Sequence, residues 1–178
     1  MNAFAVTVSP TLDDVFEDLR AYLLTIVGPG VEVIRGLGNR VSMPDAPFVV
    51  MTAVNSYRIE TNQDTYLDGF PTSPGIAQSL QATKLCVQLD FYGPQSSSWA
   101  VMVGTLLRDD QACEALNVCQ PLYADDPRMM PLVTAEDQFL ERWTLQAYVQ
   151  YNPVTTTALG FSTTLDIVPI NVDEEFPP

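Results

Sequence analysis

Two segments show the clearest alternation of apolar and polar residues along the chain. Every second side chain is apolar in residues 83–91, and the same pattern recurs over residues 141–152. The apolar series are Leu85, Val87, Leu89 and Phe91 in the first segment and Trp143, Leu145, Ala147, Val149 and Tyr151 in the second. A period of two is typical of a strand with one buried face, so we predict strands at Thr83–Phe91 and Glu141–Asn152.

Three further segments have the composition of strands. Val31–Ile34 is short and apolar, and Phe48–Ile59 begins with four apolar residues. Phe161–Val168 alternates with period two and follows the turn-rich connection TTTALG. Because Asn152-Pro153 ends the strand before it, we expect this last segment to pair antiparallel with Glu141–Asn152.

Two segments carry apolar residues at helical spacing. Leu12–Val27 follows Ser9-Pro10-Thr11, has acidic residues in its first turns and is stopped by Gly28-Pro29-Gly30. The second helix is predicted at Trp99–Leu107, with an apolar face that can lie back on the sheet.

The connections of this second helix are marked by turn-forming residues. Gly93-Pro94 breaks the preceding strand, and the hydroxyls of Ser96, Ser97 and Ser98 are predicted to cap the helix N-terminus. After the helix we expect a short helical turn at Asp109–Leu116 and a proline-bounded loop at Pro121–Pro131.

These elements predict one domain over residues 1–178 with an α/β (α+β) fold, in which helices flank a mainly antiparallel sheet. The chain has 178 residues and is 47% apolar, enough for one buried core and too short for two large domains.

Two segments outside this sheet are predicted to reach a partner. Residues 60–81 show no steady period but carry aromatic and aliphatic residues, which favours a projecting arm over a disordered linker. Residues 171–178 form an acidic, proline-terminated tail that is either frayed or lies on a neighbour. The candidate contact residues are Tyr66, Leu67, Phe70, Glu174 and Phe176.

The charge of the chain argues against direct DNA binding. Its formal net charge is -14, from 22 acidic residues against 8 basic ones. Affinity for the phosphate backbone needs clustered Lys and Arg, whereas the single lysine, Lys84, and the arginines are scattered and are expected to pair with local carboxylates. The start of the chain lacks the pattern of a signal peptide, and no window is apolar enough for a membrane span, so we expect assembly in the cytoplasm and no membrane partner.

No set of residues predicts catalysis, a metal site or a cofactor. The sequence has no histidine and no phosphate-binding glycine loop, and Cys86, Cys113 and Cys119 are interpreted as reduced, packed thiols. Tyr123-Ala124-Asp125-Asp126 matches the YxDD pattern of reverse transcriptases, whose carboxylates hold magnesium, but flanking prolines and an acidic chain favour a turn. Asp13-Asp14 and Asp109-Asp110 are interpreted as helix-capping acids. We therefore predict that the protein is not an enzyme.

The order of several short motifs resembles the neck or tail terminator proteins of tailed bacteriophages, over roughly Leu12–Val172. After the acidic N-terminal helix come Asn39, Arg40 and Pro44 of an N-R-x-x-x-P loop. The motifs that follow are VQLDFYGP, a helix ending in LLRDD, PLYADDPR and ERWTLQAYVQYN. The resemblance rests on their order, because none of them is a catalytic motif.

This resemblance implies a structural protein of the virion neck. Such a protein forms a ring, commonly a hexamer, that caps the tail tube, stops its growth and joins the tail to the head connector while DNA passes through. The expected partners are other copies of the chain, the tail tube protein and the head connector or collar protein. Two alternatives stay open: a head-proximal collar or head-completion ring, and, from a different class, a soluble acidic inhibitor or DNA mimic.

Overall fold

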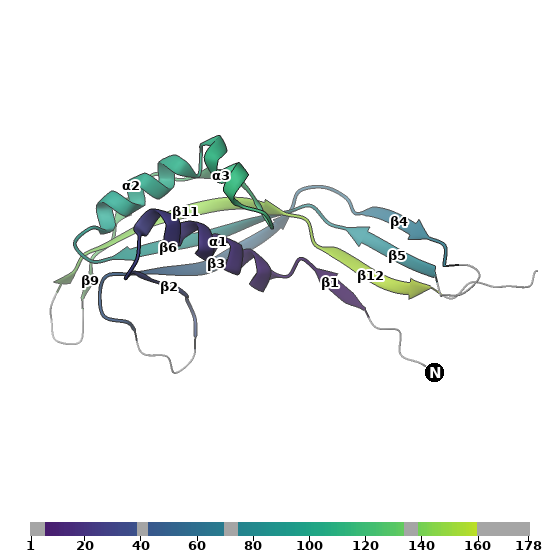
Figure 1. Cartoon of the computed structure of the whole chain (residues 1–178), viewed down its shortest axis with the longest axis horizontal. Helices are drawn as coiled ribbons and strands as arrows, with labels where there is room; N and C mark the ends of the chain where they lie inside the picture. The colour runs from purple at the N-terminus through teal and green to yellow at the C-terminus, as the bar shows by residue number, and fades with distance from the viewer. Residues whose placement is uncertain (1–5, 39–42, 70–74, 134–138, 160–178) are drawn as a thin grey trace, which may run out of the picture.

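The computed structural model describes residues 6–38, 43–69, 75–133 and 139–159, and these residues form two regions (Figure 1). One region, here called the body, is a six-stranded sheet covered by three helices. The other, here called the extension, is a four-stranded sheet that continues from one end of the body. The mixed α+β fold and the mainly antiparallel sheet confirm the predicted fold class.

The body sheet is antiparallel except at one edge. Its main path runs in the order β2 (Glu32–Arg35), β3 (Phe48–Arg58), β6 (Thr83–Tyr92), β11 (Arg142–Tyr151), β7 (Gln120–Ala124). β2 is parallel to β3, and β8 (Arg128–Met129) also pairs with β11. A separate small ladder joins β9 (Leu132–Val133) to β10 (Phe139–Leu140). The four strands predicted between Val31 and Asn152 are therefore all present.

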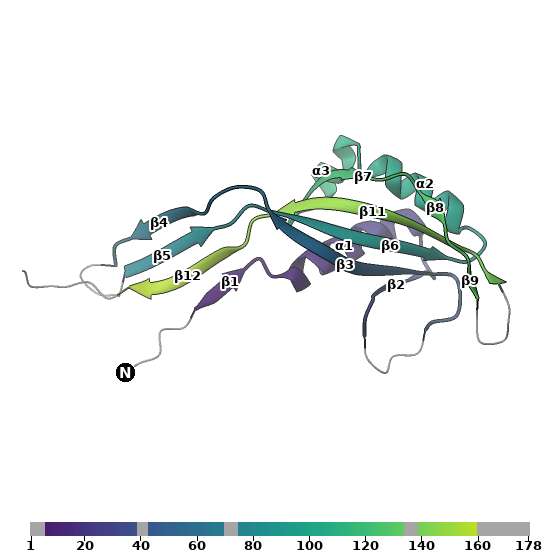
Figure 2. The ribbon, with the colours of Figure 1, turned by 180° about the vertical axis from the view of Figure 1, so that it is seen from behind.

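Three helices lie on one face of this sheet: α1 (Leu12–Val27), α2 (Ser96–Leu106) and α3 (Asp110–Ala115) (Figures 1 and 2). The alternating apolar residues of β6 and β11 point toward them and form the core with apolar residues of α1 and α2. Leu85 and Leu89 are fully buried, as their alternation predicts, and Trp143 is half-buried against the same core. Burying one such side chain contributes about 1.5–3 kcal/mol, so this shared core holds the body together.

α1 begins and ends where its flanking residues predict. The Thr11 side chain accepts a hydrogen bond from the Asp14 backbone N–H, while the Asp14 carboxylate accepts one from the Thr11 N–H. These hydrogen bonds from Thr11 lower the pKa of the Asp14 carboxyl. Gly28 closes the other end, with its N–H donating to the Leu24 carbonyl. Asp109 likewise caps α3 by accepting from the Gln111 N–H, which confirms the capping role predicted for these acids.

The predicted serine cap of α2 is wrong. The N-cap position is Gln95, and its side chain makes no capping hydrogen bond. The chain enters the helix through a turn in which the Ser96 N–H donates to the Gly93 carbonyl, and Gly93 has a φ of 112°. Because this turn places Ser96 inside the first helical turn, its hydroxyl is buried without a hydrogen-bond partner among the described residues.

The extension differs from the prediction for the end of the chain. Its strand order is β1 (Thr7–Ser9), β12 (Val154–Leu159), β5 (Gly75–Leu80), β4 (Gln63–Leu67), with every neighbouring pair antiparallel. Residues 155–159 of the TTTALG segment, predicted as a turn-rich connection, thus lie in a strand, because threonine is β-branched and suits extended backbone. β12 pairs with β1 and β5. The predicted strand Phe161–Val168 lies outside the described residues.

Two other connections also contain strands. Residues 60–81, predicted as an arm, contribute the hairpin strands β4 and β5, and they project together with β1 and β12 (Figure 1). The loop predicted at Pro121–Pro131 contains most of β7 and all of β8. The prediction of a loop was based on its prolines, but proline is tolerated in strands at the edge of a sheet.

Candidate interaction surfaces

The extension exposes both faces of its sheet. None of the helices α1, α2 and α3 lies over it in either view (Figures 1 and 2). Every residue of β1 and β4 is exposed, and every residue of β12 is only half-buried. An antiparallel sheet normally covers at least one face with a second layer, and no described helix or sheet supplies that layer for the extension.

One face of the extension carries five apolar side chains in two rows, separated by a polar row of Thr65, Gln78 and Thr156. Directly paired residues of antiparallel strands share a face, and the register places Leu67, Ile76 and Ala158 in one row and Leu80 beside Val154 in another. Leu67 is 48% exposed, and the other four side chains are half-buried.

The opposite face of the extension also mixes apolar and polar residues, and it carries one charge. It carries Tyr66, which is 68% exposed, beside Ala77, and Asp64 beside Ser79. The Ser79 hydroxyl donates a 2.6 Å hydrogen bond to the Asp64 carboxylate. Asp64 is the only charged residue within the four strand ranges, although the whole chain has a net charge of -14. Charge repulsion between copies is therefore weakest at the extension.

The structure places two of the five predicted contact residues. Tyr66 and Leu67 are neighbours on β4, so their side chains point to opposite faces of the sheet. Both are exposed, which leaves them available to a partner. Phe70, Glu174 and Phe176 lie outside the described residues.

The face of the body sheet opposite the helices carries a row of aromatic and basic side chains that the sequence did not single out. The Lys84 ammonium group lies 5.6 Å from the ring centroid of Tyr57 and 5.5 Å from that of Tyr148. The Tyr148 ring stacks on Tyr123 with centroids 4.4 Å apart. Desolvation is the main cause that raises the pKa of Tyr148 to about 12, so its hydroxyl stays protonated at neutral pH. In the sequence, the only sign of this row was that Lys84 and Tyr148 occupy polar positions of the alternating strands.

A buried ion pair lies on the same face. Asp90 is 4% exposed, and its carboxylate accepts hydrogen bonds of 3.1 and 2.9 Å from the Arg142 guanidinium. The Gln88 amide donates to both oxygens of the same carboxylate. Arg142 also lies over the Tyr92 ring. Arg142 and Gln88 thus satisfy the hydrogen-bonding capacity of the Asp90 carboxylate within the protein. This cluster therefore stabilises the sheet and leaves the carboxylate little capacity to bind a ligand.

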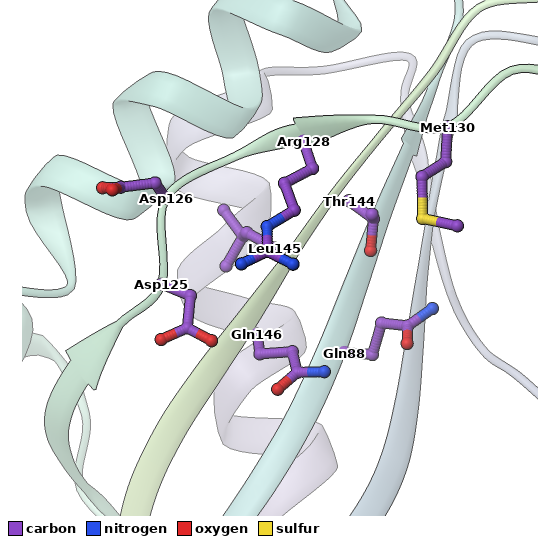
Figure 3. A pocket seen from close by; sticks show the side chains of 8 residues that line it. All are labelled: Gln88, Asp125, Asp126, Arg128, Met130, Thr144, Leu145 and Gln146. Atoms are coloured by element: carbon purple, nitrogen blue, oxygen red, sulfur yellow. The ribbon is translucent and has the colours of Figure 1, made fainter.

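The acids of the YxDD pattern lie at the edge of the body sheet, beside a pocket of about 150 Å³ (Figure 3). Asp125 and Asp126 follow β7, and Arg128 reaches from β8 across the pocket (Figure 3). Asp126 forms a 3.4 Å ion pair with Arg108, whose guanidinium also donates to the Ala124 carbonyl. Among the described residues, no group of three or more metal-ligating side chains comes together. Asp125 and Asp126 therefore lie in a loop that Arg108 holds in place.

The cysteines are free thiols in two environments. Cys86 and Cys119 are buried, and desolvation raises the pKa of each, to about 12 for Cys119. Cys113 on α3 is exposed, so the prediction that all three thiols are packed is wrong for this one. α3 is a short helix at the surface, and only Ala112 of its residues is buried.

The structure is a helix-covered α+β body that carries a second sheet, which none of the described helices covers. No helix in the described ranges has both the length and the apolar composition needed to cross a membrane. The model of the phage neck terminator protein family matches residues 13–176, and the chain belongs to this family. It is thus a structural protein of the phage neck, a component of the virion that associates with other neck and tail proteins. No curated protein matches the chain.

Proposed function

We propose that this protein forms a closed ring, of six copies, that caps the tail tube and joins it to the head connector. The ring covers the rim of the last tube ring and offers no surface for another tube subunit, so tube growth stops there. DNA passes through the lumen without specific binding, because the acidic chain repels phosphates. The ring assembles in the cytoplasm of the bacterial host.

The uncovered extension is the observation that carries this proposal beyond family membership. A heterologous ring needs one surface that reaches the next copy, and the extension reaches out of the body with exposed apolar side chains on both faces. Burying one leucine or aromatic side chain of this surface contributes roughly 1.5–3 kcal/mol. A few such residues are therefore enough to offset the repulsion between acidic copies.

An acidic inhibitor or DNA mimic is a poorer match to these features. Such a protein acts through carboxylates spaced along its contact surface, whereas the strands of the extension carry one carboxylate, Asp64, which accepts a hydrogen bond from Ser79. The family match also favours the neck.

Particles made without this protein test the function directly. If the ring caps the tube, electron microscopy of the lysate will show overlong tails or tails not joined to heads. Tails of normal length that fail to join heads would assign the protein to a collar ring on the head side. Normal infectious particles would contradict both roles.

A pair of variants tests the contribution of the extension. The double change Tyr66→Ala and Leu67→Ala removes two exposed side chains of β4 and is expected to abolish joined particles while the purified protein stays folded. The matched control is Val101→Ala with Met102→Ala, which removes two exposed apolar residues of α2 in the body. Equal particle yields from the two double variants would remove β4 from the mechanism.

A further inference from the structure

The two outer strands of the extension, β1 and β4, form edges with no pairing partner among the described residues. Each outer edge of a sheet presents unpaired N–H and C=O groups that can hydrogen-bond to another strand. On β4 all five residues are exposed, and on β1 all three are exposed. As far as the described ranges go, both edges are therefore open to a strand from another chain.

The edges of the body carry protection that the extension lacks. Charged residues Glu32 and Arg35 lie at the two ends of β2, and Pro121 lies within β7. Charges and proline are the usual devices that keep an edge strand from pairing. β1 contains neither, and the single charge of β4, Asp64, is held by the Ser79 hydroxyl across the ladder. The contrast singles out the extension as the sheet that is left able to pair.

The directions of the two edges fit each other. Because all neighbours in the order β1-β12-β5-β4 are antiparallel, β4 runs opposite to β1. Copies related by rotation about an axis along the strands keep these directions, so β4 of one copy meets β1 of the next as an antiparallel pair. A two-fold contact between two β4 strands would leave both β1 edges open, whereas β4 against β1 closes every edge with one repeated contact.

We propose that β4 of one copy pairs antiparallel with β1 of the next copy, so that the extension sheets join into one continuous sheet around the ring. This inference rests on the proposed ring and names the contact that closes it. The faces limit the pairing of β4 with β1 to two registers. Val8 lies on the same face as Tyr66 and Asp64, because Val8 pairs with Thr155, and Thr155 and Asp64 both pair with Ser79.

In one of these two registers Val8 lies opposite Tyr66, and in the other it lies opposite Asp64. The chemistry of the side chains favours the first. Val8 is 48% exposed, and placing it opposite Tyr66 joins a β-branched residue to an aromatic ring, a favourable cross-strand pair. Placing Val8 opposite Asp64 would set an apolar side chain against a carboxylate. The first register also sets Thr7 opposite Leu67 and Ser9 opposite Thr65.

Cysteine cross-linking between two kinds of subunit tests this contact. All subunits carry Cys113→Ser, which removes the exposed native thiol, and one kind carries an affinity tag. Tagged Val8→Cys subunits are mixed with Tyr66→Cys subunits, or with Thr65→Cys subunits as the matched control. The mixtures are oxidised both as purified protein and in virions assembled from both kinds. Disulfides form only over short Cα distances, so Tyr66→Cys is expected to yield several-fold more mixed dimer than Thr65→Cys.

Each other outcome overturns the pairing. Equal yields at positions 65 and 66 would mean that no strand register exists. Covalent dimers from Tyr66→Cys subunits alone would show a two-fold contact between β4 strands. No mixed dimer in either preparation would exclude contact between these edges. The ring function fails separately, if phage lacking the protein make normal particles.

A charged edge provides a second measurement that does not depend on disulfide geometry. Val8→Lys places a positive charge on the β1 edge and is expected to abolish multimers in sedimentation while leaving the monomer folded. Val101→Lys on α2 is the control, because Val101 is similarly exposed but lies on the body. Multimers that persist in Val8→Lys would contradict the proposed contact.

Discussion

The body and the extension are both built around antiparallel β-sheet, but only the body buries one face of its sheet under helices. In the body, the apolar faces of β6 and β11 meet α1 and α2, and many side chains are fully buried. In the extension, the only buried strand residue is Gly75. A few uncovered strands are marginally stable in water, so the extension draws its stability from its connection to the body and from partners.

The two regions also divide the charge of the chain. Ion pairs such as Asp90 with Arg142 and Asp126 with Arg108 lie in the body, where acidic side chains find local donors. The extension strands carry one charge. This division shows how an acidic protein can associate with copies of itself: the paired charges lie in the body, which contains the buried core.

The largest expected effect comes from the body core. Leu89→Ala removes a fully buried side chain and should lower the free energy of unfolding by about 2–5 kcal/mol, measured by urea denaturation of the purified protein. Leu67→Ala on the extension is the matched control, with an expected change within about 0.5 kcal/mol because this leucine is exposed. Similar losses in both variants would mean that the extension has a core of its own.

The buried ion pair gives the next effect. Arg142→Met removes the guanidinium and leaves the Asp90 carboxylate buried with only Gln88 as a side-chain donor, which should destabilise the body by about 2–4 kcal/mol. The double variant Arg142→Met with Asp90→Asn removes both charges and should recover part of this loss in the same denaturation assay. No recovery would show that Arg142 acts through packing on Tyr92 and not through charge.

A smaller effect is expected at the turn between β6 and α2. Gly93 has a φ of 112°, and a Cβ there would lie 3.2 Å from the Pro47 backbone. Gly93→Ala should therefore cost about 1–2 kcal/mol in thermal or urea unfolding. Gly28→Ala tests backbone strain alone, since Gly28 also has positive φ but has nothing within 4 Å of the added Cβ. A larger loss at position 28 would contradict the role of the Pro47 contact.

The smallest effect separates the surface thiol from the core. Cys113 should react quickly with a thiol reagent at neutral pH, while Cys86 and Cys119 react only after unfolding, because they are buried and burial raises the pKa of each. Mass spectrometry of the native protein should show one label. Cys113→Ser should change stability by less than about 0.5 kcal/mol and remove that label. Labelling of Cys86 in the native state would mean that the body opens locally.

The sequence predicted the body better than the extension for a physical reason. Leu85 to Phe91 alternate because one side of β6 faces a core, and a core imposes a period that can be read from one chain. Val154–Leu159 has no covered face, so its threonines showed no such period and were interpreted as a turn. The position of β1 was missed for the same reason.

The candidate contacts were partly predictable. Tyr66 and Leu67 stood out as apolar residues in a polar segment, and both are exposed. Their assignment to opposite faces of β4 required the strand register, which the segment's composition does not contain. The row of Lys84, Tyr57 and Tyr148 needed three strands to be placed side by side before it could be recognised.

The junction between the two regions gives the molecule a mechanical property. Three body strands run on into three strands of the extension: β3 into β4, β11 into β12, and β6 back from β5 (Figure 2). The Ile59 N–H donates to the Ala82 carbonyl at this crossing, and the Gln81 N–H donates to the Pro153 carbonyl. Three segments joined by hydrogen bonds resist bending far more than a single linker does. The extension therefore behaves as a stiff arm that is fixed to the body at one end. A small tilt of the body is thereby amplified into a larger displacement of the tip.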